Sequence, residues 1–224
     1  MSSQAAGTAL DIVSDAICPW CYIGKRQTEA ALAVLAREEL RFSVRWNPFQ
    51  LNPDMPKDGV ERAAYRAAKF GSAERAAELD ARVTAAARAV GLDFHLERQR
   101  RTPNTLAAHR LIWFAGTKGV QDAVVEALFA AYFSLGRDIG DIATLAEIAG
   151  QAGLDSAEAQ DFLRSDLAAS EIAAADRAAR EAGVNGVPSF FLDGYFLFSG
   201  AVPATQMAEA LRRGHAILQR EAAD

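Results

Sequence analysis

The two cysteines of this chain, Cys18 and Cys21, are separated only by Pro19 and Trp20. A disulfide that closes so short a loop removes little entropy from the unfolded chain, so it stabilises a fold less than one that joins distant segments. Because the chain has no other cysteine, the pair indicates thiol chemistry rather than a structural crosslink. The alternative is that both are unreactive core residues, which their position between a predicted strand and a predicted helix disfavours.

The segments around the cysteines have the pattern of a strand, a helix and a second strand. Residues 10–14 are mostly apolar and predict a short buried strand. Pro19 suits a first helical turn, where its missing N–H has no partner, and apolar residues continue at helical spacing to about residue 37. Residues 40–46 then alternate between apolar and polar side chains, as in a strand. Cys18 is therefore predicted at a helix N-terminus.

The middle of the chain, residues 58–183, is dominated by Ala, Leu, Glu and Arg, which favour helices. Glycines and short polar segments divide this region into several predicted helices. We expect one of them to open with Thr102 as its N-cap and Pro103 in its first turn. The region is therefore predicted to be an all-helical block.

The C-terminal part returns to strand patterns. Residues 189–192 and 195–198 are two aromatic-rich runs separated by Asp193 and Gly194, the pattern of a β-hairpin. A final amphipathic helix is predicted from Pro203 onward. The predicted order is strand, helix, strand, helical block, two strands and helix.

A cysteine at the start of a helix lies beside unpaired backbone N–H groups and the positive end of the helix dipole, and both favour the thiolate. Cys18 is therefore the predicted nucleophile, and Cys21, one turn later, would resolve the mixed disulfide. A zinc site needs two more ligands, but the three histidines, His95, His109 and His215, lack paired spacing, so no metal is expected.

Charge and hydropathy exclude other classes. The formal net charge is −5 and no run of Lys or Arg suggests a phosphate-binding patch, so nucleic acid is not expected as a partner. No glycine-rich segment fits a dinucleotide or phosphate fingerprint. Residues 1–8 have no signal-peptide pattern and no stretch has the length of a membrane span, so we expect a cytoplasmic protein without membrane contact.

Three segments carry a family resemblance: residues 14–24, Pro103-Asn104-Thr105 with Ala108-His109-Arg110, and residues 184–191 with Gly186-Val187-Pro188-Ser189 at their centre. Together they resemble the FrnE-like branch of the DsbA family, over about residues 10–218. The resemblance implies an α/β, thioredoxin-like fold with a large all-helical insertion between its βαβ half and its ββα half. Residues 8–57 and 184–224 would form the thioredoxin-like domain, and residues 58–183 the insertion.

The resemblance also implies that Cys18 and Cys21 are a redox-active dithiol and that Pro188 is cis and faces the sulfurs. His109 is expected to be a packed residue, although it is also a candidate to line the cleft between the two domains. We expect the substrate to contact residues that flank the dithiol, the proline loop and the insertion: Pro19, Trp20, Val187, Pro188 and Asn104.

The predicted function is that of a thiol–disulfide oxidoreductase (reductase, oxidase or isomerase) that acts on a disulfide in a protein or a small molecule. No bound cofactor is expected, glutathione is a candidate co-substrate, the electron partner is open, and a homodimer is compatible with the sequence. The reducing surroundings expected of a cytoplasmic protein favour reductase, isomerase or redox-defence roles over net oxidation.

One alternative is a glutathione-dependent isomerase or kappa-like glutathione transferase that acts on a small aromatic molecule. Those relatives typically carry serine in place of Cys18, and a Gly-Ser-Asp-Arg run where this chain has Ser199-Gly200-Ala201-Val202. Both differences disfavour that chemistry. A third hypothesis is that the chain is a non-catalytic binding protein whose helical block is the interaction surface.

Overall fold

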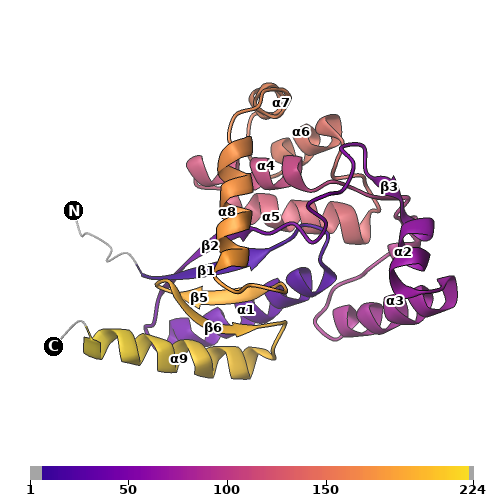
Figure 1. Ribbon diagram of the computed structural model, residues 1–224. Helices are drawn as coiled ribbons and strands as arrows, with labels where there is room; N and C mark the ends of the chain where they lie inside the picture. The colour runs from indigo at the N-terminus through magenta and orange to yellow at the C-terminus, as the bar shows by residue number, and fades with distance from the viewer. Residues whose placement is uncertain (1–6, 222–224) are drawn as a thin grey trace.

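A four-stranded sheet receives strands from both ends of the chain in the computed structural model, which describes residues 7–221 (Figure 1). The end of the predicted second thioredoxin-like segment, residues 222–224, and most of the N-terminal stretch without a signal pattern, residues 1–6, lie outside the described residues. The sheet has the order β2-β1-β5-β6, with β1 parallel to β2 and antiparallel to β5. The strands are β1 (Thr8–Ser14), β2 (Phe42–Pro48), β5 (Ser189–Leu192) and β6 (Tyr195–Ser199).

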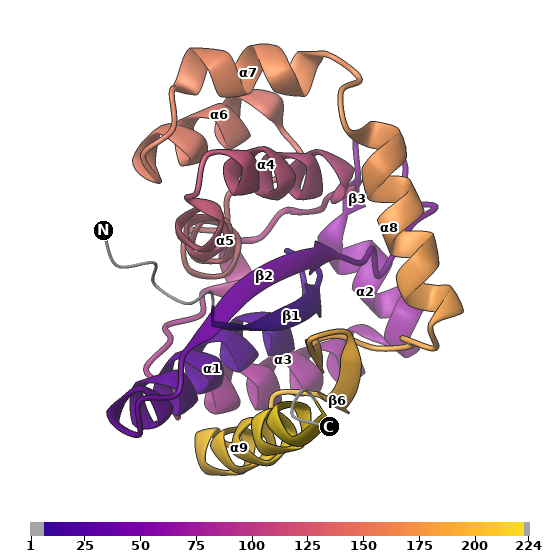
Figure 2. The same ribbon diagram turned by 90° about the vertical axis from the view of Figure 1, so that its left-hand side faces the viewer.

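Helices cover both faces of this sheet (Figure 2). On one side α1 (Pro19–Arg37) packs beside α9 (Ala204–Glu221), and on the other side α8 (Ala169–Glu181) lies against β2. The core between the layers is made of strand residues with almost no exposed surface: Leu10, Ile12, Phe190 and Leu192. The apolar runs of β1 and β5 suit their central position in the sheet, where a strand is buried on both faces. The architecture is the thioredoxin-like α/β fold predicted from the sequence.

The helical block occupies the chain between β2 and β5, as predicted, but it is not all-helical, because it also contains the two-residue strands β3 (Val60–Glu61) and β4 (Arg101–Thr102). The predicted domain boundaries fall in the loops before β3 and after α8, and the division into domains stays a prediction, since α8 contacts both β2 and α4 (Leu106–Thr117). No helix within residues 7–221 is long and apolar enough to cross a membrane. The remaining elements of the block are α2 (Arg62–Phe70), α3 (Ala73–Arg88), a short 3-10 turn (Leu96–Arg98), α4 (Leu106–Thr117), α5 (Gln121–Phe129) with a π turn (Ala130–Ser134), α6 (Ile142–Gln151) and α7 (Ser156–Arg164).

The start of α4 differs from the sequence prediction. Thr102 does not cap a helix, because it belongs to β4 (Arg101–Thr102), which pairs antiparallel with β3 (Val60–Glu61). The helix begins at Leu106, whose N–H donates to Asn104 Oδ1 at 2.9 Å. The two-residue strands are too short to show alternation in sequence, so pairing across some forty residues overrode the local capping signal.

A buried arginine joins two helices of the block. Arg110 of α4 is 6 % exposed, and its guanidinium donates hydrogen bonds of 2.7–3.0 Å to four carbonyl oxygens at the end of α7. The end of a helix presents unpaired carbonyls and a partial negative charge, so a cation is favourable there. The acceptors are the carbonyls of Phe162, Leu163, Ser165 and Leu167.

Helix α1, which begins beside the cysteines, is held against α5 by an aromatic stack and by ion pairs. Tyr22 of α1 stacks on Phe129 at a centroid distance of 5.0 Å and donates to Glu126 at 2.8 Å. Lys25, only 3 % exposed, contacts Asp122 at 3.0 Å and Glu126 at 3.3 Å. A buried ammonium is tolerated only where carboxylates surround it. These contacts hold the start of α1 against the helical block.

Candidate active site

Cys18 is the residue at which the chain turns from β1 into α1. It is the N-cap, with extended backbone angles of φ −87° and ψ 113°, and Pro19 is the first helical residue. The Cys18 N–H donates to the Asp15 carbonyl, and the Cys18 carbonyl accepts from the Cys21 N–H, both at 3.0 Å. The first turn of α1 contains no acidic residue. The sulfur of Cys18 therefore faces the positive end of the helix dipole without a competing carboxylate in that turn.

The two cysteines are both free thiols but have different surroundings. Cys18 lines a pocket, and its Sγ lies 3.5 Å from the carbonyl oxygen of Val187, to which the thiol can donate. Cys21 is fully buried one turn behind it. Burial, reinforced by the neighbouring Cys18 sulfur, raises the pKa of Cys21 well above its ordinary value, and a hydrogen bond from the Asp15 backbone offsets only part of this rise. Cys21 is therefore a protonated thiol at neutral pH.

The proline loop lies directly against the start of α1. The peptide bond between Val187 and Pro188 is cis, and Pro188 is buried. Gly24 of α1 permits this contact, because a Cβ atom at that position would lie 3.0 Å from Pro188 Cγ. Ser189, the next residue, begins β5 opposite Val13 of β1. The strand pairing and the glycine together bring the carbonyl of Val187 to the Cys18 sulfur.

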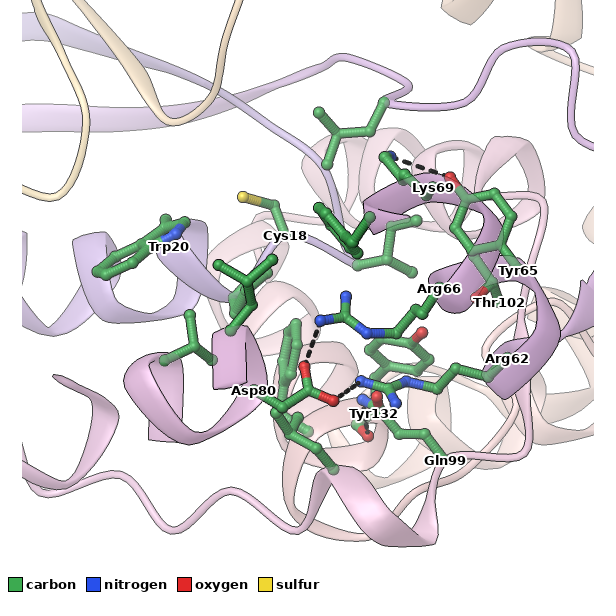
Figure 3. A pocket seen from close by; sticks show the side chains of 18 of the residues that line it. Cys18, Trp20, Arg62, Tyr65, Arg66, Lys69, Asp80, Gln99, Thr102 and Tyr132 are labelled. Atoms are coloured by element: carbon green, nitrogen blue, oxygen red, sulfur yellow. Dashed lines mark hydrogen bonds and ion pairs between the residues drawn. The ribbon is translucent and has the colours of Figure 1, made fainter. Parts of the chain in front are cut away.

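The pocket in front of Cys18 has a volume of about 530 Å³ and lies between α1, α2 and α3 (Figure 3). Four predicted site residues line it together: Cys18, Pro19, Trp20 and Val187. Trp20 is 44 % exposed, so its indole stands at the pocket entrance rather than in the core. Such a volume is typical of sites for small molecules.

Two predicted substrate-binding residues are placed elsewhere. Pro188 is buried behind Val187 and does not line the pocket. Asn104 borders a separate cavity of about 760 Å³, and its side chain is held by the Leu106 N–H and by the carbonyl of Met55, to which it donates at 2.7 Å. The local role of Asn104 is to shape the start of α4.

The basic side chains of the pocket were not predicted from the sequence. Arg62, Arg66 and Lys69 point into it from α2, and Asp80 of α3 pairs with both arginines. The available signal was the spacing of the three basic residues, four and three positions apart, which places them on one helix face. That they share a pocket with Cys18 follows only from tertiary packing, in which α2 packs on α3 and α3 packs on α1.

A buried acid and a buried histidine lie behind the dithiol. Asp15 is 0 % exposed and His109 of α4 is 2 % exposed, with Asp15 Oδ1 3.4 Å from His109 Nε2. The other carboxylate oxygen of Asp15 accepts from the Leu51 N–H at 2.7 Å. Within residues 7–221, no group of three or more His, Cys, Asp or Glu side chains is arranged to hold a metal ion. His109 is packed, as expected, and the residue that it faces, Asp15, begins the active-site turn.

Comparison with known proteins agrees with this geometry. Residues 9–212 match the family model described as the DSBA-like thioredoxin domain. A probable DsbA oxidoreductase of Streptomyces coelicolor, SCO1869, is 34 % identical, with 93 % of this chain and 90 % of that one covered and a TM-score of 0.85. The uncharacterized protein YwbO of Bacillus subtilis is 25 % identical over 190 residues, 82 % of this chain and 86 % of that protein.

A more distant structure shares the fold. The cytosolic disulfide reductase DsbM of Pseudomonas aeruginosa, solved with GSH, is 20 % identical, with 96 % of this chain and 100 % of that one covered and a TM-score of 0.62. The family match spans the sheet, the helical block and the first half of α9. This chain therefore belongs to the family of DsbA-like thioredoxin domains.

Proposed function

We propose that the protein is a thiol–disulfide oxidoreductase that works by exchange through Cys18 and Cys21. The observation that carries this proposal is the difference between the two thiols. Cys18 lies at a helix N-terminus in the wall of an open pocket, and Cys21 lies buried and protonated one turn behind it. This arrangement separates an attacking thiol from a resolving thiol.

Reduction of a disulfide then takes two exchange steps. The Cys18 thiolate attacks one sulfur of the substrate, a bond forms between Cys18 and that sulfur, and the other half of the substrate leaves as a thiolate. Cys21 next loses its proton and attacks the Cys18 sulfur, which forms the Cys18–Cys21 disulfide and releases the second half as a thiolate. The substrate gains two electrons and the dithiol loses two. Oxidation of a substrate dithiol is the same sequence in reverse.

Asp15 is the residue to which we assign the proton of Cys21. Its backbone donates to the Cys21 sulfur, and its negative charge is one of the influences that raise the pKa of Cys21. The carboxylate is fully buried, so a proton that it accepts is not exchanged directly with solvent. The Leu51 N–H holds the carboxylate through Oδ2, and Oδ1 faces His109 Nε2 at 3.4 Å without a hydrogen bond, so Oδ1 is free to accept the proton.

Single serine substitutions test the assignment. Cys18→Ser is expected to abolish the reduction of bis(2-hydroxyethyl) disulfide by dithiothreitol above the uncatalysed rate, because no attacking sulfur remains. Cys21→Ser is expected to accumulate a mixed disulfide on Cys18, visible as an adduct by mass spectrometry. Equal turnover by both variants would contradict the mechanism. A glutathione-dependent transferase or isomerase, the alternative reading, would retain its activity in Cys18→Ser.

A further inference from the structure

The pocket in front of Cys18 is positively charged although the whole chain is acidic. Its charged lining residues are four cations, Arg62, Arg66, Lys69 and Arg82, and one anion, Asp80, whereas the formal net charge of the chain is −5. A pocket with low-dielectric walls focuses the field of such a cluster and attracts ligands of opposite charge. The charge of this pocket therefore favours an anion beside the attacking sulfur.

The hydrogen bonds within the pocket leave part of this positive charge unpaired. The single carboxylate of Asp80 is shared by Arg62, at 3.0 Å, and Arg66. The Nε atom of Arg66 is buried and has no hydrogen-bond partner among the described residues. Lys69 donates only to neutral groups, the Tyr65 hydroxyl at 3.0 Å and Asn52 Oδ1 at 3.3 Å. Figure 3 shows these side chains around one opening.

Arg66 is the side chain that a bound anion would stabilise most. Burial lowers the pKa of Arg66, and the opposing effect of Asp80 is countered further by the charge of Arg62. A carboxylate in the pocket would add a second charged partner to a guanidinium whose one carboxylate, Asp80, is shared with Arg62. Both observations favour an anionic ligand beside Arg66.

The size and walls of the pocket indicate a small ligand. The volume of about 530 Å³ accommodates a small molecule, and the uncharged lining combines apolar side chains such as Phe70, Leu79 and Val83 with a few polar ones such as Gln99. Cys18 is only 4 % exposed, so a disulfide must enter the pocket to reach its sulfur. A small molecule enters more readily than a disulfide held in a folded protein surface.

We propose that this pocket binds small disulfides that carry a carboxylate, with the carboxylate against Arg66 and Lys69 and the disulfide at Cys18. This inference rests on the proposed function, which it narrows to a substrate class. The reduced protein converts one such disulfide into two thiols and becomes the Cys18–Cys21 disulfide, so two electrons pass from protein to substrate. An external dithiol, dithiothreitol in the assay, restores the reduced protein.

Binding is measured apart from chemistry in the Cys18→Ser/Cys21→Ser protein, which cannot exchange. By calorimetry, the dianion 3,3′-dithiodipropionate is expected to bind at least about tenfold tighter than neutral bis(2-hydroxyethyl) disulfide. Adding Arg66→Gln or Lys69→Gln should weaken binding of the dianion by about tenfold and leave the neutral disulfide unchanged. Arg213→Gln, on α9 and 76 % exposed, is the charge-matched control and should change neither.

The variants are folded well enough for this comparison if their circular dichroism matches the parent, and Lys69→Gln removes only bonds to neutral partners. Equal binding of the two disulfides, or dianion binding that survives both glutamine substitutions, would overturn the pocket assignment.

Kinetics with the wild-type thiols separate this proposal from the proposed function. For each disulfide, the rate at which it oxidises the protein is divided by the rate at which it oxidises dithiothreitol. A higher ratio for the dianion than for the neutral disulfide supports both the dithiol function and the pocket assignment. If both disulfides oxidise the protein at the same relative rate, the dithiol function stands and the pocket assignment fails. If the dianion binds selectively but neither disulfide oxidises Cys18, the pocket assignment stands and the dithiol function fails.

Discussion

Arg110→Met removes a guanidinium but keeps a side chain of similar length in the core. Arg110 is the only one of the three residues of the Ala108-His109-Arg110 segment whose side chain joins two helices by hydrogen bonds of its own. The guanidinium carbon of Arg110 also lies over the ring of Phe162, 5.1 Å from its centroid. Methionine loses the hydrogen bonds and exchanges this cation–π contact for a sulfur–aromatic contact of similar size, so the change mainly reports the hydrogen bonds.

The magnitude follows from the burial of the four acceptors. The bonds to the Phe162 and Leu163 carbonyls are buried, and an unpaired buried carbonyl costs about 1.5 kcal/mol each. The bonds to Ser165 and Leu167 are only partly buried, so water can replace the donor there at a cost of about 0.5 kcal/mol or less each. We expect a loss of about 3–4 kcal/mol, which corresponds to about 6–16 °C in Tm for a chain of this size.

Urea and thermal unfolding followed by circular dichroism measure this loss. Arg110→Lys should fall between wild type and Arg110→Met, because one ammonium cannot reach four separate carbonyls. Arg213→Met, at an exposed site, is the control and should stay within about 0.5 kcal/mol of wild type. A loss below about 1 kcal/mol for Arg110→Met would refute the argument that these carbonyls depend on the guanidinium.

Two further predictions concern the dithiol. Because the pKa of Cys21 is raised in the folded protein, its contribution to stability is fully present below the pKa of the unfolded thiol, about 9, and is lost as pH rises toward the folded value. From about pH 9 to 10 the unfolding free energy of the reduced protein should therefore fall by about 1 kcal/mol more than that of Cys21→Ser, because the unfolded thiol ionises over this range and the buried one does not; parallel pH profiles in urea titrations would contradict the buried thiol. Asp15→Asn keeps an oxygen that can accept from the Leu51 N–H but removes the proton acceptor, so release of the second thiol should slow at least about tenfold at pH 7 while attack by Cys18 is unchanged. Quenched-flow measurement of the two steps checks this, and an unchanged second step would exclude Asp15 from proton transfer.

Local sequence signals predicted most elements because they act over a few residues. Pro19 begins α1, as expected, since its fixed φ and missing N–H suit that position. Asp193 and Gly194 both adopt positive φ between β5 and β6, the conformation that this turn pair predicted. The prediction that Thr102 caps a helix was wrong, because the pairing of β4 with β3 decided its conformation.

The sequence by itself determined the chemistry of this protein: two cysteines, one turn apart at the start of a helix, allow thiol–disulfide exchange wherever that helix lies. Tertiary structure decided what surrounds them. The carbonyl of Val187 contacts the Cys18 sulfur, His109 faces Asp15, and the basic side chains of α2 line the pocket in front of Cys18, although all three come from segments far from the cysteines in the chain. Helix spacing places Arg62, Arg66 and Lys69 on one face, but only the packing of α2 on α3, and of α3 on α1, brings that face to the pocket of Cys18. Spacing along a chain defines which side chains share an element, whereas the neighbours of that element depend on how all the apolar faces are buried together.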